Sequence, residues 1–425
     1  MNAAAGGIAP ALLLVAATAH PAWAHVKWFS RFSFGDRPRN AGEVLTPTFF
    51  ALALLSMATI AAMVLLDRRL ADVPAYRRVN DWLSSRSDRA VLVMRIGAGA
   101  ALLLSWQADA MLAPELRVAE GWLGWFQFAL AFLLLFDRTV PVAGAGLIAL
   151  YGIGVFRFGP FHMLDYVVYA GIGYYLAVSG AGEQKIRGSG LPALYASVGF
   201  SLCWVALEKM VYPQWGLYVL EQNPRLSLGL PLSFFLLAAA FVEFSLGYLL
   251  IINLLQRPLA LVITLVFFTT TLVFGKVEVI GHTPIHAALV VFLLEGPGRV
   301  YKPPIALHRG LALRTAFAAV NFALLLALLF VPYTYGAARL HREHAAHALR
   351  TGVFVRPGSN VLEAEHGADQ VEITKVVSHQ RHTVFAARGC DQRIVDQRAR
   401  HPSAIDPVLD RKLGEHCPGR APRTM

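Results

Sequence analysis

Charged side chains are scarce in this chain of 425 residues. They account for 15% of it, whereas an average soluble domain has about 25%. Hydrophobic residues make up 56%, and the mean hydropathy is +0.51. This balance excludes an ordinary soluble globular protein. It predicts a chain built from membrane-spanning helices, with the lipid bilayer as its main partner.

Cysteine and the familiar catalytic motifs are also sparse. The three cysteines form no CxxC, CxxCH or paired zinc motif. Cys203 lies in an apolar segment and is expected to pack there, whereas Cys390 and Cys417 fall in the polar tail, where an extracytoplasmic location would permit a disulfide. The sequence has no Walker loop, no GxSxG motif with triad partners and no HExxH motif. These absences argue against an ATP-driven pump and a hydrolase.

Long apolar runs dominate what is present. After the first 30 residues, ten runs approach the length that crosses a bilayer. They cover 45–66, 90–107, 121–136, 139–157, 162–180, 191–209, 232–254, 258–275, 283–296 and 311–331. We therefore predict an all-α polytopic transmembrane bundle of about ten helices, with nine to eleven as the range.

The net charge of +11 follows the predicted topology. With the N-terminus outside, the cytoplasmic loops carry thirteen basic residues: Arg68, Arg69, Arg77, Arg78, Arg86, Arg89, Arg138, Lys185, Arg187, Arg257, Arg299, Lys302 and Arg309. The outer loops between helices carry five: Arg117, Arg157, Lys209, Arg225 and Lys276. This asymmetry fits the positive-inside rule. It predicts a bacterial inner (plasma) membrane protein with both termini in the periplasm and no nucleic-acid partner.

The first residues resemble a signal peptide. An apolar run over 8–19 is followed by a proline and by the A-x-A pattern at 22–24 (AWA), which predicts cleavage of residues 1–24. A second A-x-A pattern at 17–19 (ATA) would instead release His20. In both cases the mature chain begins with a histidine, and the first pattern makes that residue His25.

An N-terminal histidine offers two metal ligands at once. The free α-amine and the imidazole of His25 can chelate one copper ion, and a further histidine would complete the site, because nitrogen ligands of this kind suit copper. The alternative is that His25 is first only because cleavage must leave some residue there. The segment 25–44, rich in aromatic and basic residues, is expected to lie on the outer surface as an interfacial arm.

Two stretches of the chain follow one plan. Each of the blocks 90–180 and 191–297 has four apolar segments and ends with a helix entered through Gly, Pro and His. The segments 45–66 and 311–331 flank them as the first and last transmembrane helices. Polar sites in membrane proteins often lie between such repeats. The tail 336–425 is polar, carries eight of the 14 histidines, and is predicted to be disordered beyond about residue 356.

Short motifs stand in both blocks. In the second block they are EK at Glu208 and Lys209, YP at Tyr212 and Pro213, FVE at 241–243 with Gly247, and GHTP at 281–284. In the first block they are Arg95, Gly97, LDY at 164–166 and Gly171. With these motifs the blocks resemble the DoxX-like family of four-helix membrane proteins. The resemblance implies two four-helix units and an association with quinone-coupled, redox-linked membrane assemblies.

Glu243 is the most conspicuous polar residue at membrane depth. It lies in the middle of an apolar run, where a charged carboxylate needs a cation or strong donors and is otherwise protonated. Its alternative role is a structural hydrogen bond between helices. We expect Glu208 and Lys209 to form a surface pair, with Tyr212, Trp215 and Tyr218 at the membrane interface.

Histidines and acids mark the outer ends of both blocks. In the second block, Thr283 and Pro284 are expected to start a helix, with Glu278, His282 and His286 nearby. These three side chains could bind a divalent metal or pass protons, or could merely cap helix ends. The equivalent end of the first block carries the candidates His162 and Asp165.

Three functions therefore remain open. The first is a redox-linked, quinone-coupled component in which Glu243, Glu208 and Asp165 carry catalysis or proton movement. The second is a protein that binds or transports copper or another metal. Its ligands would come from His25, His162, Glu278, His282 and His286. The third is a non-catalytic assembly subunit with a membrane or periplasmic partner.

Overall fold

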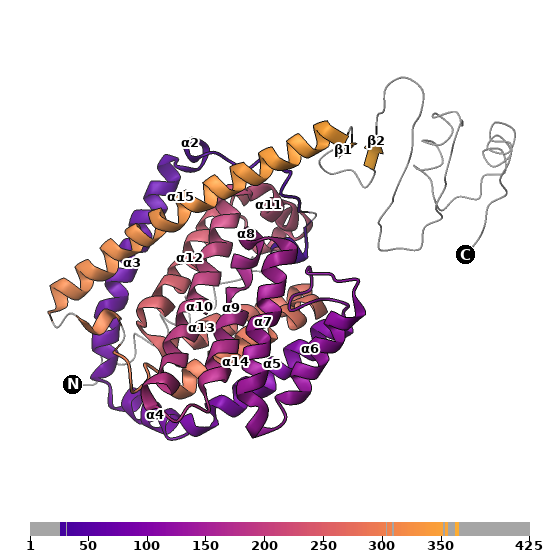
Figure 1. Ribbon diagram of the computed structural model, residues 1–425. Helices are drawn as coiled ribbons and strands as arrows, with labels where there is room; N and C mark the ends of the chain where they lie inside the picture. Colours follow the sequence, from indigo (N-terminus) through magenta and orange to yellow (C-terminus); the bar gives the residue numbers. More distant parts are fainter. Residues whose placement is uncertain are drawn as a thin grey trace, which may run out of the picture. The chain divides into compact units, whose positions relative to one another are not determined.

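The computed structural model describes residues 26–30, 32–302, 304–307, 310–351, 353–355 and 362–364 (Figure 1). The chain divides into two compact units, one of residues 1–32 and 38–337, the other of residues 33–37 and 338–425. The predicted signal peptide, His25, Cys390 and Cys417 lie outside the described residues, as does most of the tail.

The first unit is a helical bundle. Its α-helices are α2 (Ala41–Val44), α3 (Pro47–Ala71), α4 (Pro74–Ser84), α5 (Ala90–Gln107), α6 (Gly121–Leu133), α7 (Val140–Phe158), α8 (Pro160–Met163), α9 (Val167–Val178), α10 (Gln184–Val211), α11 (Pro213–Gln222), α12 (Leu232–Ile252), α13 (Gln256–Phe274) and α14 (Lys276–Glu295). Single 3-10 turns form η1 (Val26–Trp28), η2 (Ser87–Arg89), η3 (Asp137–Thr139), η4 (Leu164–Tyr166), η5 (Pro224–Ser227) and η6 (Pro304–Leu307).

One long helix, α15 (Leu311–Thr351), begins in the first unit and continues into the second. It carries the tail histidines His341, His344 and His347. The second unit also contains a short antiparallel pair of strands, β1 (Val353–Val355) and β2 (Leu362–Ala364), in which Val353 lies opposite Ala364. Apart from these strands, the described chain is helical, which confirms the predicted all-α class.

In the part of the chain that the structure describes, eight helical segments are long and apolar enough to cross a membrane, so the chain is a multi-pass membrane protein. They are Pro47–Ala71, Ser87–Gln107, Asp137–Phe158, Gln184–Val211, Leu232–Ile252, Gln256–Phe274, Lys276–Glu295 and Leu311–His347.

Two of the ten predicted runs differ from this set. The run 121–136 contains the short helix α6, of 13 residues. The run 162–180 is divided into α8, η4 and the 12-residue α9, and the helix before it ends at Gly159, which has a φ of 84°. A left-handed glycine followed by a proline stops one helix and starts another, because glycine tolerates that conformation and proline suits a first helical turn.

The two predicted blocks pack against each other reciprocally. The first helix of the first block, α5, packs against the last helix of the second, α14, while α9 packs against α10 (Figure 1). Each block therefore contributes its first and last helices to the boundary with the other. Residues of α9, α10 and α14, together with η4, α12 and α13, line the cavity described below.

The start predicted for the last helix of the second block is wrong. That helix does not begin at Thr283 and Pro284, because α14 starts at Lys276, directly after Gly275, and runs through Pro284. The Thr283 hydroxyl donates to the Val279 carbonyl at 2.5 Å instead of capping a helix. Proline inside a membrane helix is tolerated when hydroxyl groups and neighbouring helices compensate for the missing backbone bond.

Glycines bring α10 and α12 close together. A Cβ at Gly199 would lie 2.5 Å from the carbonyl oxygen of Gly247, and one at Gly247 would lie 2.5 Å from that of Gly199. Because the obstructing atoms belong to the backbone, a side chain could be accommodated only by moving the helices apart. Small residues permit this close approach of membrane helices.

We expect Gly199→Val to lower the free energy of unfolding by about 1–3 kcal/mol, the usual cost of overpacking a core. The measurement is thermal unfolding of the purified protein in detergent. Gly152→Val on α7 is the matched control, since a Cβ there meets nothing within 4 Å. Equal stability of the two variants would contradict the close-packing argument.

Candidate functional site

The segment after the predicted cleavage site enters the bundle. Val26 and Lys27 in η1 are buried. Trp28 Nε1 donates to the Tyr166 hydroxyl at 3.0 Å, and the Trp28 ring packs so tightly on Gly281 of α14 that no Cβ would fit there. The beginning of the predicted interfacial arm therefore lies inside the protein instead of on its surface.

Lys27 sits among carboxylates. Its ammonium contacts Asp165 in η4 and lies 2.6 Å from Glu208 Oε2 in α10, and all three side chains are almost completely buried. Burial by itself lowers the pKa of Lys27, but the negative charges of Asp165, Glu208 and Glu115 outweigh it and raise that pKa above its ordinary value. These carboxylates therefore favour the charged form of Lys27 in this site.

Glu115 and His162 form a second contact beside it. Glu115 Oε1 lies 2.6 Å from His162 Nε2. One ligand atom from each of Glu115, His162 and Asp165 lies within 4.8 Å of the other two. Carboxylate oxygens and an imidazole nitrogen at these separations could hold a metal ion. We refer to these three residues as the triad.

The loop that carries Glu115 connects α5 to α6 and is fixed by hydrogen bonds around Leu112. The Leu112 N–H donates to Gln127 Oε1 at 3.1 Å. The Leu112 carbonyl accepts from the Ser105 hydroxyl at 2.7 Å and from the Tyr169 hydroxyl at 2.5 Å. Non-helical backbone is tolerated at membrane depth only when protein groups satisfy it in this way. The loop can therefore place an acid beside α8.

Lys209 and Glu243 make a buried pair, with Lys209 Nζ 2.7 Å from Glu243 Oε2. The predicted surface pair of Glu208 and Lys209 is wrong, because both are buried and each has another partner. Successive residues on a helix point about 100° apart, as 3.6 residues make one turn. Adjacent side chains on α10 consequently reach different neighbours, Lys27 and Glu243.

The predicted interface position is also wrong for Tyr212 and Trp215, whereas Tyr218 is exposed. Tyr212 and Trp215 are buried, and their rings stack in parallel with centroids 4.1 Å apart. Lys27 Nζ lies 5.9 Å from the Trp215 ring and 5.7 Å from the Phe32 ring. The rings of Phe32 and Trp215 therefore lie beside the Lys27 ammonium. Tyr212 and Trp215 are inside the protein and do not face the membrane interface.

Glu278, His282 and His286 follow one another along α14. The His282 ring contacts the Glu278 carboxylate and stacks on Phe267, with ring centroids 4.2 Å apart. His286 lies one turn further on, against the ring of Phe268. None of the three belongs to the triad, so their predicted role as metal ligands remains a prediction.

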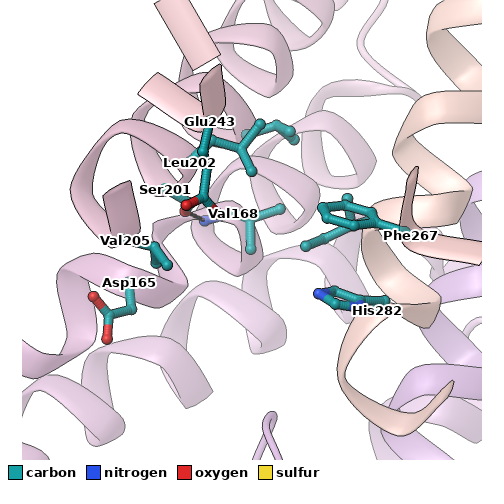
Figure 2. Close-up of a pocket in the computed structure, with 10 residues that line it drawn as sticks. Asp165, Val168, Ser201, Leu202, Val205, Glu243, Phe267 and His282 are labelled. Carbon is teal, nitrogen blue, oxygen red and sulfur yellow. Dashed lines mark hydrogen bonds between the residues drawn. The ribbon is translucent and has the colours of Figure 1, made fainter. Parts of the chain in front are cut away.

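A small cavity lies beside three of these residues, Asp165, Glu243 and His282 (Figure 2). Its volume is about 40 Å³, and its polar lining consists of Asp165, Ser201, Glu243 and His282. Figure 2 shows Asp165 and Glu243 on one side of the cavity and His282, beneath Phe267, on the other. The apolar lining residues are Val168, Val198, Leu202, Val205, Phe267 and Ile285.

The sequence identified some of these residues and missed others. It pointed to six residues that the structure buries in several separate ion pairs: His162, Asp165, Glu208, Glu243, Glu278 and His282. Glu115, and Lys27 and Lys209 as partners of the buried acids, were missed. A signal for Glu115 exists in the sequence, where an acid interrupts the apolar stretch AMLAPEL.

The fold and the site together define a multi-pass membrane protein with buried lysines, acids and histidines between its helices. No protein-family model, no curated protein and no solved structure matches this chain.

Proposed function

We propose that this protein binds a divalent transition-metal ion at Glu115, His162 and Asp165. The observation that carries the proposal is the convergence of three ligand atoms, all within 4.8 Å of one another, inside a membrane bundle. Such a mixed oxygen and nitrogen set suits first-row divalent metals. If the triad only stabilised the fold, the protein would have no affinity for metal ions.

The sequence adds a further ligand to this proposal. His25 precedes Lys27 by two residues, and Lys27 contacts Asp165 of the triad. A chain processed after Ala24 would carry a free α-amine and an imidazole at His25. We propose that these nitrogens join the site and that copper is its metal, since nitrogen donors favour copper over the other divalent metals.

The test is metal binding by the purified, processed, full-length protein. We expect about one Cu²⁺ or Zn²⁺ per chain. His162→Ala and Asp165→Asn should lower the metal affinity by roughly 10–100-fold or more, because mutating a residue that only hydrogen-bonds to a metal ligand already costs that much. His344→Ala is the matched control, because His344 is exposed on the part of α15 in the second unit. His25→Ala tests the N-terminal contribution separately. Absence of metal from the parent protein would overturn the proposal.

A second candidate is the redox-linked, quinone-coupled function implied by the DoxX-like resemblance. It is favoured because residues that carry the resemblance, Glu208, Lys209, Glu243 and His282, are all buried and each forms an ion pair. The cavity of about 40 Å³ is too small for a quinone ring, so quinone would have to bind at another surface.

In this second candidate, Glu243, Glu208 and Asp165 would move protons during electron transfer. Quinone reduction by membranes carrying Glu243→Gln tests it, and unchanged activity would count against a role for that acid. An assembly subunit is the remaining hypothesis. It gains support if neither metal binding nor quinone reduction is found and a partner protein is lost on purification.

A further inference from the structure

We infer that α4 lies on the membrane surface and binds the headgroups of anionic phospholipids. This inference does not rest on the metal-binding proposal, because α4 contains no residue of the triad. It assigns a ligand of defined chemistry, a phosphate group held in the bilayer by its acyl chains, to a helix that none of the functions considered above uses.

α4 connects two candidate membrane spans. The first, Pro47–Ala71, ends just before α4, and the second, Ser87–Gln107, begins just after it. A helix of 11 residues is about 16 Å long at a rise of about 1.5 Å per residue, so it cannot cross a hydrocarbon core of about 30 Å. α4 is therefore confined to the membrane surface, at the end of the bundle where these two spans meet it (Figure 1).

One face of α4 packs on the bundle. The side chains of Tyr76, Asn80, Leu83 and Ser84 are half-buried. Ser84 Oγ accepts a hydrogen bond from Arg257 Nη2 at 2.8 Å, and α4 packs against α3 and α14. These contacts fix the orientation of α4 about its own axis, so a different face is turned away from the bundle.

The exposed face of α4 is apolar with a basic edge. It carries Ala75, Arg78, Val79 and Trp82, which follow one another at the three- and four-residue spacing of a helix face. Val79 is 54% exposed and Trp82 is 56% exposed. Apolar and tryptophan side chains on one face, with basic residues beside them, are typical of helices that lie in the membrane interface.

Trp82 and Arg86 form one unit at the end of this face. The Arg86 guanidinium lies 4.0 Å from the centroid of the Trp82 ring, and Arg86 Nη1 donates to the Trp82 carbonyl at 2.8 Å. An indole that favours the interface is thus held beside a cation. A phospholipid offers matching groups, because its acyl chains and its phosphate lie next to each other in the same interface.

Arginines dominate the charge around α4. The segment 68–89 contains six arginines, which are Arg68, Arg69, Arg77, Arg78, Arg86 and Arg89. It contains three acids, Asp72, Asp81 and Asp88. Six positive and three negative charges leave a net charge of +3 on this segment. A positive surface next to the bilayer favours anionic lipids over zwitterionic ones, since a zwitterionic headgroup compensates its own phosphate.

Four of these arginines have guanidinium groups that can bind a phosphate. Arg68, Arg69, Arg77 and Arg78 are exposed, and within the part of the chain that the structure describes they form no ion pair. By contrast, the Arg157 guanidinium is paired with a carboxylate on another part of the chain. Arginine binds phosphate through two parallel N–H donors. The four guanidinium groups therefore supply the donors, and Trp82 supplies the apolar anchor.

The test is quenching of Trp82 fluorescence in the full-length protein, reconstituted into bilayers of equal parts phosphatidylglycerol and phosphatidylcholine. One of the two lipids is brominated at a time, and the Trp82→Phe variant isolates the Trp82 signal. We expect brominated phosphatidylglycerol to quench Trp82 more strongly than brominated phosphatidylcholine. Arg78→Gln should lower this lipid preference by about fivefold, the usual contribution of one basic residue near an anionic surface.

Two variants separate charge from packing. Arg78→Lys should keep most of the preference, because lysine also binds phosphate as a point charge. Arg138→Gln is the matched control and should leave the preference unchanged. Arg138 is exposed in η3, at the same end of the bundle, since its neighbour Asp137 contacts Arg95 near the start of α5.

Three results would overturn the inference. The first is a Trp82 signal that neither brominated lipid quenches, which would place α4 away from the bilayer. The second is equal quenching by the two lipids, or an equal loss of preference in Arg78→Gln and Arg138→Gln. The third is loss of the preference when inorganic phosphate is added at constant ionic strength, which would assign the arginines to a soluble phosphate instead of a lipid.

Discussion

Replacing Lys27 with methionine is expected to destabilise the folded protein by about 3–5 kcal/mol, the usual cost of removing one partner from a buried ion pair. The ammonium contacts Asp165 and lies 2.6 Å from Glu208 Oε2. The side chains of Asp165 and Glu208 have no exposed surface. Methionine keeps a similar shape but leaves both carboxylates without that counter-charge. Thermal unfolding in detergent measures the loss.

Two comparisons make this result specific. Lys185→Met is the control, because Lys185 is exposed at the start of α10 and should be almost neutral. Adding Glu208→Gln to Lys27→Met should recover part of the lost stability, since residues in contact do not contribute independently. An unfolding temperature of Lys27→Met equal to that of the parent protein would contradict this expectation. It would show that Lys27 does not anchor η1 in the bundle.

Replacing Lys209 with methionine should have a comparable effect on a different face of α10. Glu243 lies in the middle of α12, and its carboxylate is 2.7 Å from Lys209 Nζ. Both side chains are almost completely buried, so loss of the ammonium leaves a buried charge or forces the carboxyl to bind a proton. We expect a loss of about 3–5 kcal/mol.

The decisive comparison for Lys209 is the neutral pair. Lys209→Met combined with Glu243→Gln should be much more stable than Lys209→Met alone, because replacing both partners of a buried pair is often tolerated. A double variant no more stable than the single one would show that Lys209 acts through packing instead of charge. The measurement is again the unfolding transition in detergent.

Much of the fold was accessible to sequence reasoning because the membrane imposes a simple rule. Backbone groups in lipid must be satisfied within helices, so long apolar runs can be assigned before any tertiary contact is known. The failures lie where the chain departs from that rule. The predicted span 162–180 is divided into α8, η4 and the short α9, and α14 continues through Pro284 because a membrane bundle compensates for its missing donor.

Sequence reasoning identified only some residues of the site, and the reason is different. Glu243 could be identified from its position in an apolar run, and its need for a cation could be stated. Lys209, its cation, was assigned to the surface together with Glu208, since neighbours in sequence look like a pair. Helical geometry separates such neighbours, and only the packing of α10 between Lys27 and α12 showed where each one points.

The sequence by itself determined that this is a helical, multi-pass membrane protein with ionisable groups at membrane depth, because length, hydropathy and isolated charges are local properties of the chain. Tertiary structure decided which of those groups meet. Glu115 reaches His162 across 47 positions, and Lys27 reaches Asp165 across 138. Such pairings depend on how loops and helices fold back on one another, and no local pattern encodes that distance.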